Sequence, residues 1–432
     1  MTLSRAMLVL FIASSALAQP ASTSTNEPKP RRALAAHKRD VSFVGFTPDG
    51  KHLISSGLEE AQRPGGPRGM TIETGVARLW DLAGNSSSTL EGVPVDITTT
   101  MSGDDKQWVF TVQPTGSFTT YDVATGKSKS LVATSPDGKA VLEGDKLRYL
   151  STPYDNASSG KTIPLTGIAR PVSNFTQSGM FSPDGRTLAM RDKDENIMLW
   201  DVPGGRHTFT LPDSNGNWFV FSRDGQTLAV PGRKKYLAAP DRQLGVQLFS
   251  VATGRKIGSL EAASDEVIAS VVFSPDSRQV ASAGIYTLSV FSAATGKKIK
   301  ACEKTPYEKG PTALIGPPGG TQIRTTTWAI QPRIDMHLVF SPDGRIVAGK
   351  CADGTIKLWD VSGGRIMATL KGPPNPAAFK PDGKSAPAPG QRAIPWTMVT
   401  TLAAYSPDGR TVAAGLEDGQ VLLWDAPGAK PR

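Results

Sequence analysis

Residues 340–360 read FSPDGRIVAGKCADGTIKLWD, and this stretch carries the two signals that decide the fold. In its opening turn, Pro342 fixes the backbone φ angle, Asp343 can bond back to the chain, and Gly344 can take the left-handed conformation. Apolar runs lie on both sides of this turn, so it predicts a hairpin of two β-strands. A further strand is predicted to end in the Trp-Asp pair at residues 359–360.

Both signals recur along the chain, which predicts a repeat protein. The turn motif, usually an aromatic residue followed by Ser-Pro-Asp-Gly, begins at Phe46, Thr134, Phe181, Phe221, Phe273, Phe340 and Tyr405. The clearest closing motifs are the pairs Trp80 and Asp81, Trp200 and Asp201, Trp359 and Asp360, and Trp424 and Asp425; weaker versions contain Tyr121, Phe249 and Phe291. The unit is therefore strand a, a Ser-Pro-Asp-Gly turn, strand b, a loop, strand c ending in Trp-Asp, a Gly turn and strand d.

These two motifs resemble the WD40 repeat family over residues 34–426. The resemblance implies a single all-β propeller, a wheel of four-stranded blades that binds a partner and is not an enzyme. The chain departs from the family because the Gly-His pair that usually opens a repeat is missing almost everywhere, and only His37 stands near such a place. We therefore expect the family's hydrogen-bonded set of His, Ser, Trp and Asp to be incomplete. The aspartate's place, in the turn between strands b and c, is occupied by Asp194, Asp353 and Asp418.

The number of blades follows from the closing motifs and the length. Seven closing motifs are clear, and a degraded unit lies near residues 135–150. Without its insertions, the repeating part gives about 40 residues per unit for eight blades and about 45 for seven. Eight blades are favoured, and seven are the alternative. The chain ends after a strand c, and residues 32–36 resemble a lone strand d, so the N-terminal strand is expected to complete the last blade and close the ring.

The N-terminal residues predict export. Arg5, an apolar run over residues 6–17 and small residues before Ala18 resemble a secretory signal peptide that covers residues 1–18. The run is too short to span a bilayer comfortably, so we expect cleavage and no membrane span afterwards. The predicted organisation continues with a disordered leader (19–31), the propeller (32–426) and a short tail (427–432). The expected location is the periplasm, the cell envelope or the extracellular space of a bacterium.

The net charge of +9 comes from scattered basic residues with acidic residues between them. Aromatic residues do not alternate with them at regular spacing, and a nucleic-acid site needs a concentrated basic footprint. We therefore expect no nucleic-acid partner, and interpret the charge as solvation or as attraction to an acidic surface.

Four insertions exceed the basic repeat: 59–75, 232–243, 303–333 and 371–397. The first two fall between strands b and c, and the last two between strands d and a. Both kinds of loop emerge at the same end of an up-and-down blade, so all four insertions are predicted to lie on one face. Insertions of repeat proteins often form the binding face. We therefore predict that a protein or a cell-envelope component binds this face of a monomeric propeller.

Candidate contact residues stand in or beside these loops. Trp328 and Trp396 end the two long insertions, and Trp218 precedes a strand a. Tryptophan is enriched at binding hot spots. A basic run of Arg233, Lys234 and Lys235 lies on the same face and could supply a charge contact. Packing of the tryptophans under their own loops, and simple solvation of the basic run, are the alternative interpretations.

Motifs for catalysis, cofactors and metals are not visible in the sequence. No Gly-x-Ser-x-Gly or His-Glu-x-x-His motif occurs. Residues 159–162 (Ser-Gly-Lys-Thr) resemble the end of a phosphate-binding loop, but the glycine that begins such a loop is missing. Two cysteines without suitably spaced histidines cannot form a structural zinc site, but Cys302 and Cys351 could form a disulfide. Two alternatives to a protein-binding scaffold stay open: a propeller-type hydrolase such as a lactonase, with its site at the channel mouth, and a carbohydrate-binding propeller that uses the same tryptophans.

Overall fold

A computed structural model describes the chain between residues 27 and 428, with gaps. The described residues are 27–47, 49–62, 71–84, 86–90, 97–101, 107–112, 118–122, 127–131, 135, 139–143, 146–149, 161–165, 179–192, 194, 196–212, 214, 219–232, 245–261, 268, 270–284, 287–302, 314–315, 324–325, 338–351, 354–374, 401 and 403–428. Within these ranges the regular elements are all β-strands and no helix occurs. The predicted all-β class is confirmed.

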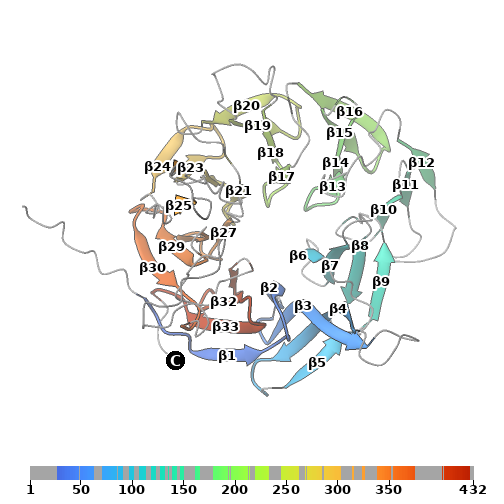
Figure 1. Ribbon diagram of the computed structural model, residues 1–432. Helices are drawn as coiled ribbons and strands as arrows, with labels where there is room; N and C mark the ends of the chain where they lie inside the picture. Colours follow the sequence, from blue (N-terminus) through green and yellow to red (C-terminus); the bar gives the residue numbers. More distant parts are fainter. Residues whose placement is uncertain are drawn as a thin grey trace, which may run out of the picture.

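The strands form antiparallel sheets that follow one another around a ring (Figure 1). The first sheet contains β2 (Val41–Phe46), β3 (His52–Gln62), β4 (Thr71–Asp81) and β5 (Ser87–Leu90). The second contains β6 (Ile97–Met101), β7 (Gln107–Val112), β8 (Phe118–Asp122) and β9 (Lys127–Leu131). A three-stranded sheet follows, with β10 (Ala140–Glu143), β11 (Lys146–Tyr149) and β12 (Thr162–Pro164).

Three further four-stranded sheets continue the ring. They contain β13 (Gly179–Phe181), β14 (Thr187–Arg191), β15 (Ile197–Asp201) and β16 (Arg206–Leu211); β17 (Val220–Phe221), β18 (Thr227–Pro231), β19 (Val246–Ser250) and β20 (Lys256–Leu260); and β21 (Ser270–Phe273), β22 (Gln279–Ala283), β23 (Leu288–Ser292) and β24 (Lys298–Ala301). In each sheet, strand a lies nearest the centre of the ring and strand d lies at its outer rim (Figure 1).

The last part of the chain forms two more four-stranded sheets. One contains β27 (Leu338–Phe340), β28 (Ile346–Lys350), β29 (Ile356–Asp360) and β30 (Ile366–Leu370), and the other contains β31 (Ala404–Tyr405), β32 (Thr411–Gly415) and β33 (Gln420–Asp425) together with β1 (Arg32–Ala35). A small pair, β25 (Leu314–Ile315) and β26 (Arg324–Thr325), lies within the insertion 303–333. The resulting architecture is a β-propeller, as predicted.

The Ser-Pro-Asp-Gly segments form the predicted turns between strands a and b. At residues 341–346, the Ser341 Oγ donates a hydrogen bond to Asp343 Oδ1 (2.6 Å) and accepts one from the backbone N of Ile346 (3.0 Å). Gly344 has a φ angle of 72°, which favours glycine. The same serine-to-aspartate bond occurs in the turns that begin at Ser182, Ser222, Ser274 and Ser406. These five sheets therefore share the same locally encoded hairpin.

The hydrophobic core is divided among the interfaces between neighbouring sheets. One cluster, for example, joins Leu358 and Leu370 of one sheet to Val412 and Trp424 of the next, and all four side chains are buried. Burial of such side chains is the main stabilising contribution to the fold. Each of the six described clusters joins two neighbouring sheets, so these sheets depend on one another for their cores.

The first strand of the described chain lies in the same sheet as the last three. Strand β1 pairs antiparallel with β33, with Arg32 opposite Leu423 and Leu34 opposite Val421. This is the arrangement that a ring closed by its N-terminal strand requires. Residues 132–134, where a strand a of the three-stranded sheet would be sought, lie outside the described residues. The blade count of eight and the closure of the ring therefore stay predictions.

Candidate binding face

All four insertions connect strands at the same end of the sheets. The segment 59–75 lies between β3 and β4, and 232–243 lies between β18 and β19. The segments 303–333 and 371–397 connect a strand d to the strand a of the next sheet. Since neighbouring strands are antiparallel, b–c and d–a connections share one end, which we call the insertion face. The opposite end carries the uniform Ser-Pro-Asp-Gly turns.

The insertion 59–75 is partly regular structure. Strands β3 and β4 continue their pairing from Glu59 opposite Thr74 to Gln62 opposite Thr71. The hairpin therefore extends beyond the usual blade. The six predicted contact residues, Trp218, Trp328, Trp396, Arg233, Lys234 and Lys235, lie outside the described residues. Their role stays a prediction.

A buried polar network lies at the base of this hairpin. The sequence pointed to its members His37 and Trp80, but not to Ser55 and Glu59. Trp80 Nε1 donates a hydrogen bond to Ser55 Oγ (2.9 Å), and His37 Nε2 lies 2.9 Å from the same oxygen. On its other side, His37 Nδ1 lies 3.7 Å from Glu59 Oε1, which accepts a 2.7 Å bond from Arg78 Nη2. The first distance is too long for a hydrogen bond, so the contact between His37 and Glu59 is electrostatic.

The network assembles His37, Ser55, Trp80 and an acid in the first sheet, but His37 Nδ1 has no hydrogen-bond partner in the described structure, so the hydrogen-bonded set is incomplete there, as expected. His37 does occupy the family position, in the loop between a strand d and a strand a. The acid is Glu59, because the lengthened hairpin places a glutamate where a short turn would place an aspartate. Sequence reasoning missed Glu59 because it searched only short b–c turns for the acid.

Burial decides the protonation of His37. Removal from water lowers its pKa to about 4, and the nearby Arg78 guanidinium acts in the same direction, while Glu59 opposes them. The imidazole is therefore neutral at neutral pH. Its position is fixed further by the backbone, because the N–H groups of Ala36 and His37 both donate to the carbonyl of Gly419 (3.1 and 2.8 Å). One residue thus joins the polar network of the first sheet to the b–c turn of the last.

In the other Trp-Asp sheets, the position of Ser55 is not occupied by a residue with a hydroxyl group. In the first sheet, Ser55 stands two residues after Leu53, which pairs with Trp80. The matching residues in the other three sheets are Met190, Gly349 and Ala414. Accordingly, the buried Nε1 atoms of Trp200 and Trp424 have no hydrogen-bond partner in the described structure. Here too the expectation of an incomplete set is correct.

The disulfide that the sequence allows between the two cysteines is not formed in this structure. Cys302 and Cys351 are free thiols, buried in the same core cluster between the β21–β24 and β27–β30 sheets. Burial raises the pKa of the Cys302 thiol to about 11, which keeps it protonated. The pair therefore contributes here as apolar packing.

The described residues contain neither a metal-binding cluster nor a membrane-spanning helix. Over the described ranges, no three His, Cys, Asp or Glu side chains gather in a way that could hold a metal ion. No helix long and apolar enough to cross a membrane occurs in this part of the chain. Neither result tests the predicted absence of catalysis.

Comparison with known families identifies the repeats. The model of the family described as WD domain, G-beta repeat matches residues 28–60, 332–360 and 395–425. These segments contain parts of the first sheet and of the two last sheets. Three segments of the chain therefore match WD40 repeats.

Individual relatives match parts of the chain. It is 24% identical to the COMPASS component SWD3 of Saccharomyces cerevisiae over 55% of this chain and 66% of that protein. It is 34% identical to Protein HIR1 of Yarrowia lipolytica over 23% and 10%, and 26% identical to WD repeat-containing protein SL1-17 of Schistosoma mansoni over 42% and 50%. The matches thus span at most 66% of each relative's own length. All three organisms are eukaryotes, so these relatives do not support the bacterial exported type.

We predict that Ala414→Ser stabilises the protein. The new hydroxyl would stand where Ser55 stands in the first sheet and would accept a bond from the unpartnered Trp424 Nε1, a gain of about 1 kcal/mol. Ala413→Ser is the matched control, because Ala413 is equally buried but packs in the neighbouring cluster. The free energy of unfolding of Ala413→Ser should fall by about 1–3 kcal/mol, because this variant buries a hydroxyl. Urea unfolding midpoints of the two variants measure this, and equal losses in both would contradict the prediction.

We also predict a pH dependence that originates in His37. The pKa of this histidine is about 6.5 in the unfolded chain and about 4 in the fold, so the unfolded state binds the proton first as pH falls. The free energy of unfolding should therefore decrease from pH 6.5 to about 4 and then level off with respect to this group. His37→Gln, which cannot titrate, should show a shallower decrease in urea unfolding at pH 7, 5.5 and 4.5. Parallel curves for the two proteins would refute the assignment.

Proposed function

We propose that this propeller is a non-catalytic WD40-type scaffold outside the cytoplasm, and that it binds a protein or a cell-envelope component through the insertion face. The observation that carries the proposal is the placement of all four insertions on b–c and d–a connections. Loops on a rigid framework are the usual carriers of recognition. The described a–b turns, in contrast, repeat one hydrogen-bonded pattern.

The described part of the insertion face supports a preorganised platform. The β3–β4 hairpin extends by regular pairing, and its base is held by the 2.7 Å ion pair between Arg78 and Glu59. Both side chains are largely shielded from solvent, with exposed fractions of 28% and 15%. A loop fixed in this way loses little conformational freedom when a partner binds.

The relatives favour protein partners in general terms. One of them is described as a component of COMPASS, which makes it a part of an assembly. Because the match covers 55% of this chain at 24% identity, it supports the class of function and not the identity of the partner.

Deletion of the two long insertions is expected to abolish partner capture. Immobilised full-length protein would be compared with variants that lack residues 303–333 or 371–397, using an envelope extract and identification of bound components by mass spectrometry. Components held by the insertion face should be lost from at least one deletion variant. The matched control is Arg223→Ala with Arg278→Ala, on exposed a–b turns at the opposite end, which should retain them.

Unchanged capture by both deletion variants would contradict the assignment of the insertion face as the binding surface, provided that their unfolding midpoints stay near that of the native protein. Loss in the deletion variants with retention in the control supports it.

Export is tested separately by N-terminal sequencing of the protein isolated from its own source. If the signal peptide is removed after Ala18, the mature chain begins at Gln19. A chain that retains residues 6–17 would contradict this part of the proposal without affecting the choice of binding face.

A further inference from the structure

Three large apolar side chains are exposed in the described structure, and all three lie on strands d. They are Ile257 on β20, Ile299 on β24 and Met367 on β30, with exposed fractions of 36%, 55% and 38%. These strands belong to three successive sheets and lie along the outer rim of the ring (Figure 1). The apolar residues therefore form a group and are not scattered over the surface.

The three residues occupy the same structural position. In β20, Gly258 pairs with Leu248 and Lys256 pairs with Phe249, so Ile257 is the unpaired residue of a β-bulge. Ile299 and Met367 are skipped in the same way in β24 and β30. A bulge of this kind redirects a side chain relative to the regular pleat.

The fold itself does not require an apolar residue at this position. Strand β16 has the same bulge, and the skipped residue there is Thr208. Its hydroxyl donates a 2.9 Å hydrogen bond to the carbonyl of Leu199, so the chain tolerates a polar side chain at the bulge. The apolar residues of the next three sheets thus need another explanation.

The three sites form a continuous strip. A Cβ atom added to Gly258 would lie 2.6 Å from the carbonyl oxygen of Thr295, which belongs to the c–d turn of the next sheet. In the same way, a Cβ on Gly364 would lie 2.9 Å from Lys300 Cε of the preceding sheet. Strands β20 and β24 therefore each touch the c–d turn of the next sheet, so the three sheets are in contact along the rim that carries the exposed residues.

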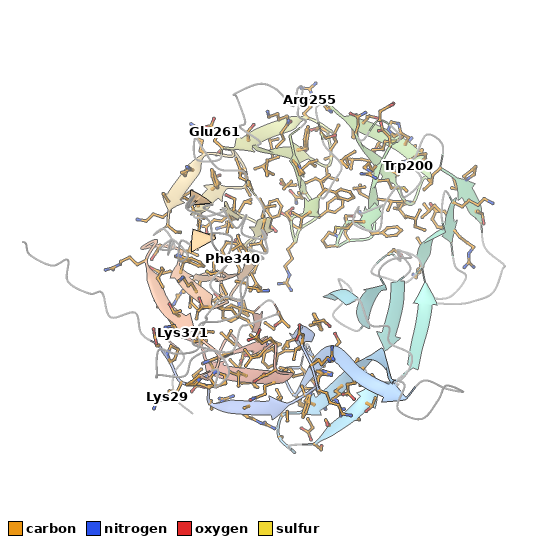
Figure 2. All side chains as sticks on the ribbon, in the orientation of Figure 1. Lys29, Trp200, Arg255, Glu261, Phe340 and Lys371 are labelled. Carbon is orange, nitrogen blue, oxygen red and sulfur yellow. The ribbon has the colours of Figure 1, made fainter. Side chains whose placement is uncertain are left out.

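The strip is strongly basic. The segments 255–260, 297–301 and 365–370 contain six basic residues, Arg255, Lys256, Lys297, Lys298, Lys300 and Arg365, and no acidic residue. Five of the six are exposed, and Lys300 is partly exposed. Figure 2 shows Arg255 at the outer edge of the ring, with Glu261 marking the far end of β20. We call the strip of these six basic residues and the three apolar ones the basic rim.

Protection of edge strands explains only part of this pattern. Lysines on an exposed edge discourage pairing with another sheet. That function does not favour exposed isoleucine and methionine between the lysines. The combination of basic groups with protruding aliphatic side chains is instead typical of surfaces that contact anionic bilayers, where the charges meet headgroups and the apolar groups enter the interface.

We propose that the basic rim binds the surface of an anionic lipid bilayer. The apolar members are aliphatic, and none is an aromatic residue of the kind that stacks on nucleic-acid bases. The rim is the convex outer wall of a wheel, which suits a broad deformable surface. Three protruding side chains and six positive charges contact the bilayer together, without any segment that spans it.

Vesicle sedimentation tests the proposal with the full-length chain. Vesicles of phosphatidylcholine alone are compared with vesicles that contain phosphatidylglycerol, and the measured quantity is the excess binding to the anionic vesicles. This excess is insensitive to any nonspecific attachment of the apolar residues 6–17. The native protein should show it, and added salt should reduce it because exposed charges are screened.

Two sets of variants separate the contributions. The triple variant Ile257→Thr, Ile299→Thr and Met367→Thr copies the natural Thr208 and should fold, yet its affinity for anionic vesicles should fall about tenfold, since most of its apolar area can no longer enter the interface. Lys256→Glu with Lys297→Glu should lose binding more completely. Arg223→Glu with Arg278→Glu is the matched control, because it changes the same charge in the same two sheets on exposed a–b turns.

Each outcome decides the question. Retention by the control pair with loss in both rim variants supports the basic rim. Equal losses in the two charge-reversed pairs would show that only net charge matters and would overturn the proposal. Native affinity for anionic vesicles in the triple threonine variant would also overturn the proposal. Binding to a soluble acidic polypeptide or an oligonucleotide that leaves anionic vesicles unbound would assign the rim to another partner class and reject the bilayer.

Discussion

The pairing of β1 with β33 is the contact on which the rest of the structure depends. It places residues from the two ends of the chain in one sheet, and it brings the next loop against the Gly419 turn. The cluster beneath it contains Leu34 and Val41 from the beginning of the chain and Val421 and Leu423 from its end. Without this pairing, Leu34 and Ala36 would be lost from the apolar cluster that joins the first and last sheets.

His37 extends this joint from apolar packing to hydrogen bonding. Its backbone is bound to the last sheet, and its ring is bound to Ser55 in the first sheet. The ring is buried and neutral at neutral pH. When the pH falls and His37 is protonated in the unfolded chain, the free energy of unfolding decreases. In the sheets where Met190 or Ala414 replaces the serine, the indole N–H stays unpartnered, and apolar packing alone holds the tryptophan. The most complete network therefore occurs where two ends of the chain must be held together.

Local turn chemistry made most of the fold predictable, whereas the polar network and the basic rim depend on register. The Ser-Pro-Asp-Gly turns encode their own hydrogen bonds, so strands a and b could be placed from sequence wherever the motif is clear. Glu59 could not be assigned, because its proximity to His37 results from the extension of the β3–β4 pairing. The sequence also did not show that Ile257 and Met367 occupy the same structural position. Only the β-bulges show that both residues are unpaired within their strands. The tryptophans predicted for the insertion face lie outside the described residues and stay a prediction.

The two proposed surfaces impose a geometry on each other. Strands d form the outer wall, and the insertion face lies at one end of the same strands, so the two surfaces are different sides of the ring. A wheel bound through the basic rim therefore stands on its edge, with the insertion face directed along the bilayer and open to a partner. Among the described residues, the exposed large aliphatic side chains lie in the sheets β17–β20, β21–β24 and β27–β30. The insertions 232–243, 303–333 and 371–397 belong to or border these same sheets. Partner binding and bilayer binding would thus occur on the same arc of the ring, which favours a partner that is itself located at the bilayer surface.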